Sequence, residues 1–387
     1  MTDPTRTYQP DWDIFCRVVD NFGDIGVCWR LARDLASHHG RSVRLWVDDW
    51  SAFARLCPAA AGAPGHFAEN GVEVRRWTDP LPPVEPPAVV IEAFACDVPA
   101  PYLAAMAARR PRPVWINLEY LSAEAWVGEC HRLASPHPRL PLVKHFFFPG
   151  FAPDTGGLLR EPGLLAARDA LQRDPAVRAA WLAAAGVGTV PAEACLISLF
   201  SYEQAGLAAL LQHWSASPRP VWLLVPQGRV VPQVAAFLGE ADAPAGGHHT
   251  RGALTVVMLP FLTQDGYDRL LWSCDVNFVR GEDSFVRAQW AARPFVWHIY
   301  AQQDDAHRVK LEAFLERYLA GLADDAADAV RGLWRAWNGD GEAAARWPAF
   351  AAALPRVEAH TRTWAEALAC VPDLTTTLVH FCEERVE

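Results

Sequence analysis

The sequence predicts an α/β protein built from two doubly wound, Rossmann-like domains. Its 387 residues exceed what one hydrophobic core usually supports, because single cores stop growing at about 250–300 residues. Short apolar runs alternate with polar turns and helix-period segments, a pattern typical of parallel strands covered on both faces. The alternation restarts in the second half, where "ACLISLF" (194–200) precedes "SYEQ" and "AGLAALLQHW".

Each predicted strand is one of these short apolar runs. In the first half they span 12–19, 42–47, 71–77, 88–94, 113–118 and 144–150. In the second half they span 194–200, 220–226, 253–260, 275–279 and 294–300. After about residue 305 the pattern is wholly helical. We therefore expect two open α/β domains facing each other across a cleft, with a C-terminal helical segment and ligands beyond the carboxyl ends of the strands.

An Ala-rich helical stretch at 166–187 separates the two halves, so we place the domain boundary near 185–192. The N-terminal domain is predicted to span 1–187 and to be completed by C-terminal helices at about 360–387. The C-terminal domain is predicted to span 188–359.

Composition and charge exclude several classes of protein. A net charge of −10 without a Lys/Arg-rich run argues against binding to nucleic acid or to a membrane surface. No charge-free apolar stretch approaches about 18 residues, and the polar N-terminus does not resemble a signal peptide. Nine cysteines without a CxxC pair indicate buried thiols in a reducing cytoplasm. No His or Cys group has metal-ligand spacing, so we expect no metal.

The turn "DNFGDIG" (20–26) follows the first predicted strand and precedes a helix that Gly40 is expected to end. It lacks the third glycine of a GxGxxG phosphate loop, and it carries two carboxylates, Asp20 and Asp24. In one interpretation Asp24 is the N-cap of a helix from Ile25 and Asp20 is a turn residue. In the other, the pair holds a cation or takes a proton, which requires a raised pKa for Asp24 or a cationic substrate. Residue patterns leave both open.

A second polar turn, "RGEDS" (280–284), lies between a strand and a helix expected to begin near Ser284. Helix N-termini attract anions, so Arg280 and the Ser284 hydroxyl are candidates to cradle a diphosphate. Glu282 is better suited to accept hydrogen bonds from ribose hydroxyls. Alternatively, Glu282, Asp283 and Ser284 are helix-capping groups.

Aromatic rings follow several predicted strands of the second half. Phe200, Tyr202, Phe261 and Tyr300 are candidates to surround a pyrimidine base, and Gln264 is a candidate for an amide hydrogen bond to it. Aromatic residues at strand ends are also common members of the core, and that alternative stays open.

Several stretches together resemble the bacterial elongation factor P arginine rhamnosyltransferases. They are "WDIFCRVVDNFGDIGVCWRLARDLA", "VRLWVDD", "VWINLEYLSAEAW", "FFFPGF", "SLFSYE" and "RGEDSFVRAQWAARPFVWHIYAQQDDAH". The resemblance runs nearly the whole length and implies a GT-B fold with two facing Rossmann-like domains. It also implies inverting transfer of L-rhamnose from dTDP-β-L-rhamnose to one arginine of elongation factor P, which relieves ribosome stalling on polyproline. Neither a metal, a membrane nor direct contact with nucleic acid is implied.

The resemblance also implies roles for individual residues. Asp24 would be the general base and Asp20 its partner, in a first domain that receives the protein acceptor. The nucleotide sugar would be bound by Phe200, Tyr202, Phe261, Gln264, Arg280, Glu282, Asp283, Ser284 and Tyr300, with Asn21, Phe22 and Gly23 from the opening turn. Two other functions stay open, namely another GT-B glycosyltransferase with a glycan or lipid acceptor, and a catalytically silent nucleotide-sugar-binding protein.

Overall fold

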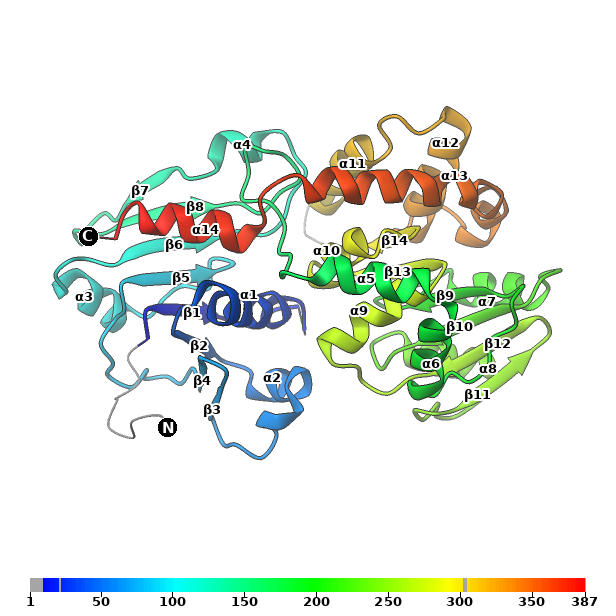
Figure 1. The fold of residues 1–387 in the computed structure, drawn as a ribbon, viewed down its shortest axis with the longest axis horizontal. Coiled ribbons are helices and arrows are strands. Elements are labelled where there is room, and N and C mark those ends of the chain that lie inside the picture. The colour runs from blue at the N-terminus through cyan, green and yellow to red at the C-terminus, as the bar shows by residue number, and fades with distance from the viewer. Residues whose placement is uncertain (1–9, 21, 302–304, 387) are drawn as a thin grey trace. The chain divides into compact units, whose positions relative to one another are not determined.

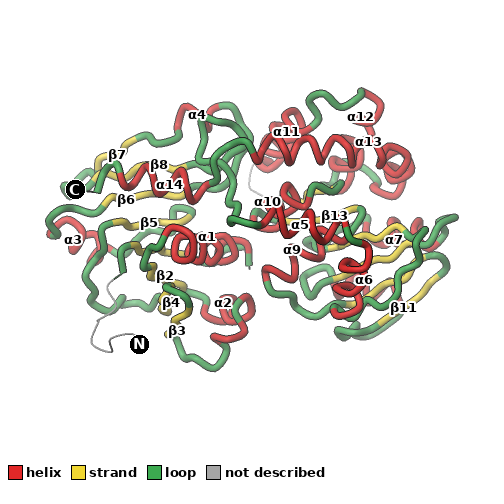
Figure 2. Tube along the Cα trace, in the orientation of Figure 1, coloured by secondary structure: helices red, strands yellow, loops and turns green. Residues whose placement is uncertain are grey.

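The structure, a computed structural model, describes residues 10–20, 22–301 and 305–386 (Figure 1). The chain divides into two compact units. The first unit comprises Met1–Pro162 and Val371–Glu387, and the second comprises Gly163–Cys370. Each unit is built around one mainly parallel sheet flanked by helices (Figure 2).

The first unit contains a sheet of order β3-β4-β2-β1-β5-β6-β8-β7. Its strands are β1 (Trp12–Cys16), β2 (Val43–Val47), β3 (His66–Glu69), β4 (Val72–Arg76), β5 (Val89–Ala93), β6 (Val114–Leu118), β7 (Ala134–Pro136) and β8 (Val143–Phe147). Its helices are α1 (Gly23–His39), α2 (Trp50–Leu56), the 3-10 turn η1 (Pro58–Ala60), α3 (Ala100–Ala108), α4 (Trp126–Cys130) and α14 (Leu374–Glu383). Strand order reverses between β1 and β5, the point at which open α/β sheets bind ligands.

The second unit contains a sheet of order β11-β12-β10-β9-β13-β14. Its strands are β9 (Cys195–Leu199), β10 (Val221–Val225), β11 (His248–Arg251), β12 (Leu254–Met258), β13 (Val276–Arg280) and β14 (Phe295–His298). Its helices are α5 (Leu164–Arg173), α6 (Pro175–Ala184), α7 (Leu207–Ser215), α8 (Val231–Leu238), α9 (Gln264–Ser273), α10 (Asp283–Ala291), α11 (Ala306–Tyr318), α12 (Asp324–Trp337) and α13 (Ala343–Ala369). Here the order reverses between β9 and β13.

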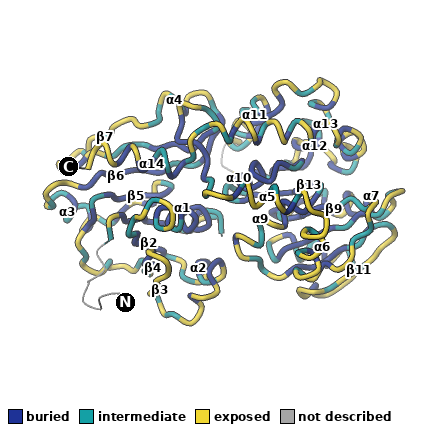
Figure 3. The backbone as a smooth tube through the Cα atoms, viewed as in Figure 1, coloured by how far each residue is buried: buried dark blue, intermediate teal, exposed yellow. Residues whose placement is uncertain are grey.

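The predicted fold class is confirmed, and every apolar run singled out in the sequence holds or overlaps a strand. The core strands β1, β2, β5 and β6 are buried at every position, as expected for parallel strands covered on both faces (Figure 3). Pattern reading missed β3, β7 and β11, which pair antiparallel with β4, β8 and β12. These three edge strands are largely exposed and therefore carry no apolar run.

The boundary between the units differs from the predicted one. Helices α5 and α6 belong to the second unit rather than to the end of the first. Their polar side chains explain why, because the Gln172 amide donates to the carbonyls of Trp272 and Ala291, and Arg168 donates to that of Trp290. At the other end, the chain returns to the first unit at Val371 instead of near residue 360.

Within the described ranges, none of the helices is long and apolar enough to cross a bilayer. All nine cysteines lie in these ranges and are free thiols. Most of them are buried, as their scattered spacing predicts.

Candidate functional site

The acidic turn of the first unit links β1 to α1 at the point where strand order reverses. Helix α1 begins at Gly23, and its N-cap is Phe22, whose side chain makes no capping hydrogen bond. The interpretation of Asp24 as the N-cap is therefore wrong, because Asp24 lies inside the first helical turn. Asn21 lies outside the described residues.

Asp24 is held in a defined orientation by the backbone that precedes it. Its Oδ2 atom accepts hydrogen bonds from the N–H groups of Val19 at 2.7 Å and Asp20 at 2.8 Å. Its Oδ1 atom accepts a longer bond of 3.3 Å from the Tyr120 hydroxyl. The side chain is almost fully buried, with the residue 2% exposed. Oδ1 is therefore the less constrained oxygen and the better candidate to accept a proton.

The surroundings of Asp24 raise its pKa above the ordinary value of an aspartate. Burial is the largest cause, because it removes water from the charged form. The two backbone N–H bonds oppose this effect, and the negative charge of Asp20 adds to it. A carboxylate with a raised pKa meets the requirement for a general base that works near neutral pH.

Asp20 lies against the start of α1. Its carbonyl accepts a hydrogen bond from the Gly23 N–H at 2.7 Å, which closes the turn. A Cβ atom at position 23 would lie 3.1 Å from the Asp20 Oδ2 atom. Glycine at this position therefore leaves room for the carboxylate. Phe22 and Gly23, which the resemblance assigns to the donor, lie on this same turn.

Tyr120 was missed in the residue patterns, although it lies in the quoted stretch "VWINLEYLSAEAW" just after β6. Its ring stacks on that of Phe94, with centroids 4.5 Å apart and planes 19° apart. Phe94 follows β5 and has φ +56°, a left-handed conformation uncommon for a bulky residue. This aromatic pair positions the Tyr120 hydroxyl on Asp24. Its position two residues beyond the end of β6 was the sequence feature that could have identified it as a site residue.

In the second unit, a cationic and aromatic cluster lies where β9 and β13 end. The Arg280 guanidinium is 4.6 Å from the ring centroid of Phe200 and 4.7 Å from that of Tyr202. Both distances are within the range of cation–π attraction. Arg280 is only 4% exposed. We call Phe200, Tyr202, Arg280 and Tyr300 the Arg280 cluster.

Tyr202 joins the other members of this cluster. It makes edge contacts with Tyr300 at 5.5 Å and with His298 at 5.3 Å between centroids. Burial, with the charge of Arg280, lowers the pKa of His298 to about 4, so this imidazole is neutral at physiological pH. Tyr300 is 41% exposed and presents its ring to solvent. Four of the predicted donor-binding side chains are thus brought together.

The "RGEDS" turn has the predicted sharp bend, with Gly281 at φ +59°. Helix α10 begins at Asp283, and the N-cap residue Glu282 makes no side-chain capping bond. The Ser284 hydroxyl accepts a hydrogen bond from the Arg280 N–H at 2.9 Å and donates to the Arg280 carbonyl. Ser284 therefore fixes the turn rather than capping α10.

Helix α10 is anchored beneath this turn by a buried ion pair. Arg287 donates two hydrogen bonds to the carboxylate of Asp268 on α9, at 2.9 Å and 2.7 Å. This fork geometry fixes α10 relative to α9. It keeps the N-terminus of α10, with its partial positive charge, next to Arg280.

Phe261 and Gln264 follow β12. In the sheet, β10 lies between β12 and β9. Gln264 is the first residue of α9 and is buried, whereas Phe261 is half-buried. Tyr267, one turn along α9, contacts the Phe200 ring at 5.4 Å between centroids. The start of α9 therefore borders the Arg280 cluster. Together these groups suit a ligand that has both an aromatic ring and anionic oxygens.

Comparison with known proteins matches residues 12–383 to a family described as Elongation-Factor P (EF-P) rhamnosyltransferase EarP. A protein-arginine rhamnosyltransferase of Pseudomonas putida is 55% identical over 370 residues, which cover 96% of this chain and 98% of that protein. A solved structure that describes EarP-mediated arginine glycosylation of translation elongation factor EF-P is 43% identical, with a TM-score of 0.71. That match covers 97% of this chain and 100% of the solved one.

A UDP-glucosyltransferase from Polygonum tinctorium shares the fold at 12% identity, with a TM-score of 0.50. The match covers 97% of this chain and 99% of that one. At this identity the similarity concerns the fold alone, which is the two-domain GT-B architecture of glycosyltransferases.

Proposed function

The chain belongs to the EarP family of elongation factor P rhamnosyltransferases, and we propose that it is an inverting protein-arginine rhamnosyltransferase. It transfers L-rhamnose from dTDP-β-L-rhamnose to one arginine of elongation factor P in the cytoplasm, which supports relief of polyproline stalling. Neither nucleic acid nor a membrane takes part directly. The observation that carries the proposal is the buried Asp24 carboxylate, whose Oδ2 is held by the N–H groups of Val19 and Asp20 while Oδ1 accepts only a long bond from Tyr120.

Asp24 acts as the general base. The guanidinium of a substrate arginine is protonated, with a pKa above about 12, and is a poor nucleophile. Asp20 and Asp24 bind and orient this cation. As the new C–N bond forms and the bond from the anomeric carbon to the diphosphate breaks, the attacking nitrogen becomes acidic. Asp24 Oδ1 takes that proton, and dTDP leaves on the opposite face, so the anomeric configuration inverts.

The Arg280 cluster binds the donor. Phe200, Tyr202 and Tyr300 provide flat surfaces for thymine, and Arg280 with the N-terminus of α10 attracts the diphosphate. Glu282 accepts from sugar hydroxyls. Supporting donor contacts come from Asn21, Phe22, Gly23, Phe261, Gln264, Asp283 and Ser284. Because cationic and N–H groups stabilise the leaving diphosphate, we propose no metal for the transfer step.

The proposal is tested by incubating the full chain with dTDP-β-L-rhamnose and elongation factor P. Intact-protein and peptide mass spectrometry should reveal one deoxyhexose on one arginine. Donor binding is measured in parallel by calorimetry. Donor binding without modification of elongation factor P would overturn the proposal in favour of a nucleotide-sugar-binding protein. Transfer to a glycan or lipid acceptor instead would identify another glycosyltransferase.

A further inference from the structure

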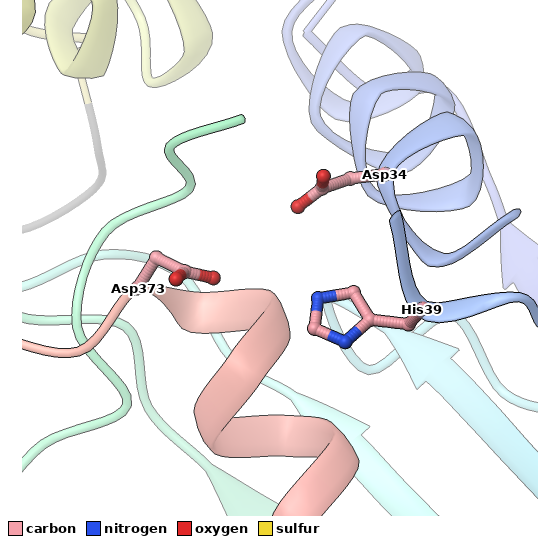
Figure 4. Close-up of side chains that lie close together, drawn as sticks. All are labelled: Asp34, His39 and Asp373. Carbon is pink, nitrogen blue, oxygen red and sulfur yellow. The ribbon is translucent and has the colours of Figure 1, made fainter. Parts of the chain in front are cut away.

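Three side chains able to bind a metal meet in the first unit, where α1 ends and α14 begins (Figure 4). They are Asp34 and His39 on α1 and Asp373, which directly precedes α14. One ligand atom from each residue lies within 4.8 Å of the others. The three side chains point toward a common space.

Asp34 is the most constrained member of the group. It is 1% exposed, and its Oδ1 atom pairs with the His38 Nδ1 atom at 2.7 Å. Its Oδ2 atom is buried and makes no hydrogen bond within the described part of the chain. A buried carboxylate oxygen without a donor is unfavourable unless a cation compensates its charge. This oxygen is the observation that points to a ligand.

Within the described residues, the neighbouring side chains do not supply that compensation. The His38 ring pairs with the other carboxylate oxygen, Oδ1. Thr375 on α14 is fully buried, and its hydroxyl makes no hydrogen bond in the described part of the chain.

The other two residues are already oriented for a shared ligand. Asp373 accepts hydrogen bonds from the Thr376 N–H at 2.9 Å and the Thr376 hydroxyl at 2.8 Å, which fixes it as the N-cap of α14. His39 is the last residue of α1, before Gly40 at φ +64°. One of its ring nitrogens faces the space between the two carboxylates. Hydrogen bonds that orient carboxylates in this way are typical around metal ligands.

We propose that Asp34, His39 and Asp373 form a binding site for a divalent transition-metal ion such as Zn²⁺, which fastens α14 to α1. One imidazole nitrogen and two carboxylate oxygens suit Zn²⁺ better than Mg²⁺ or Ca²⁺, which prefer oxygen ligands. Bonds of about 2.0–2.2 Å require ligand atoms to approach one another more closely than 4.8 Å. Half-buried His39 can close this gap by side-chain rotation toward the two fixed carboxylates, with water as a fourth ligand.

The site is structural and independent of the proposed transfer reaction. It ties the returning C-terminal segment to α1, the helix that carries Asp24 in its first turn. Metal binding would therefore stabilise the first unit without touching a substrate.

The test uses the full chain, stripped with EDTA and then titrated with ZnCl2 by calorimetry, with MgCl2 for comparison. We expect one Zn²⁺ per chain and a melting temperature several degrees higher in excess Zn²⁺. His39→Ala, Asp373→Asn and Asp34→Asn should each lower Zn²⁺ affinity at least about tenfold. Asn at position 373 can still cap the N-terminus of α14, so this variant should keep the helix intact. The control is His380→Ala, which removes an exposed histidine of α14 outside the group and should leave affinity unchanged.

Two results would overturn the site. One is wild-type protein that binds no Zn²⁺ at micromolar concentration. The other is His39→Ala and Asp373→Asn binding Zn²⁺ as tightly as wild type, which would indicate adventitious binding by other histidines. Circular dichroism checks the fold of each variant. If the buried Asp34→Asn substitution prevents folding, the two half-buried positions decide the question alone.

Discussion

The two units place opposite charges at the same topological position. In each sheet the strand order reverses beside the first strand, between β1 and β5 in one unit and between β9 and β13 in the other. The first reversal point carries the carboxylates Asp20 and Asp24 on the turn after β1. The second carries the guanidinium of Arg280, the last residue of β13, over the aromatic rings of Phe200 and Tyr202, which follow β9. In the proposed function, the shared architecture therefore sets where ligands bind, and the residues at the strand ends decide which ligands these are.

The two positions also differ in how they respond to pH. The pKa of Asp24 is raised mainly by burial, so this carboxylate takes up a proton at a higher pH than an ordinary aspartate does. Arg280 keeps its charge throughout the physiological range. Changes at the first position should therefore alter catalysis and its pH dependence, and changes at the second should alter donor affinity.

The largest expected effect is on Asp24. Asp24→Asn preserves the shape of the side chain but removes the base, and we expect transfer to slow by about 10²–10⁴-fold. Donor affinity, measured by calorimetry, should stay within about twofold of wild type. A large loss of donor binding would show that Asp24 itself contacts the donor and would contradict its role as the base.

The same variant should be slightly more stable than wild type near neutral pH. The folded-state pKa of Asp24 is raised, so ionised Asp24 destabilises the fold above that pKa, and the effect disappears as pH falls through it. Thermal melts at pH 7 and pH 4 test the sign, because the difference between the two proteins should shrink at the lower pH.

The next largest effect is expected at Arg280. Arg280→Ala removes a cation held between two rings, and donor dissociation constants should rise about 10–100-fold. Arg280→Lys keeps the charge but loses the planar contact with the rings. Its donor dissociation constant should therefore lie between those of wild type and Arg280→Ala. The matched control is Arg251→Ala, which removes a similar contact to Phe237 in the same unit and should not change donor affinity. Unchanged donor affinity in Arg280→Ala would contradict the donor assignment.

A smaller effect is expected from Tyr120→Phe. In wild type the hydrogen bond from the Tyr120 hydroxyl lowers the pKa of Asp24. Removing this hydroxyl should therefore raise that pKa further and move the acidic limb of the pH–rate profile to higher pH. The rate at neutral pH should fall about 2- to 10-fold, the range of one net hydrogen bond. A lower rate with an unshifted profile would indicate that Tyr120 contacts the acceptor instead.

Gly23→Ala should have a milder effect still. Its Cβ would lie 3.1 Å from the Asp20 Oδ2 atom and push this carboxylate aside. We expect a few-fold slower transfer at nearly unchanged melting temperature. Gly62→Ala serves as control, since a Cβ there meets no atom within 4 Å. Equal rates for both variants would mean that the position of Asp20 does not matter.

No loss of transfer is expected when divalent metal is removed. EDTA should leave the transfer rate unchanged at a temperature well below the melting point. It should lower the melting temperature if Asp34, His39 and Asp373 hold a metal. Strict dependence of transfer on a divalent ion would contradict the metal-independent mechanism, whereas a stability effect alone would not.

Apolar runs in the sequence predicted strands reliably where a strand is buried on both faces, and they failed where a strand is exposed. The parallel strands were predicted because both faces are covered, and β3, β7 and β11 were missed because they lie exposed at sheet edges. The boundary between the units was misplaced since an Ala-rich stretch does not reveal which sheet it packs on. The side chains of Arg168 and Gln172 in this stretch donate to the carbonyls of Trp290 and Ala291, more than a hundred residues away in sequence. These contacts assign the stretch to the second unit.

The amino-acid sequence by itself determined the parallel strands, the two-unit α/β architecture and the residue types at each strand end, because periodicity and turn chemistry act over a few residues. Only the tertiary structure decided that Asp24 is buried with a raised pKa, that Tyr120 donates to it, and that Arg280 lies between Phe200 and Tyr202. It likewise decided that Asp34 meets Asp373. Proximity and desolvation depend on packing between distant segments, which no local pattern encodes.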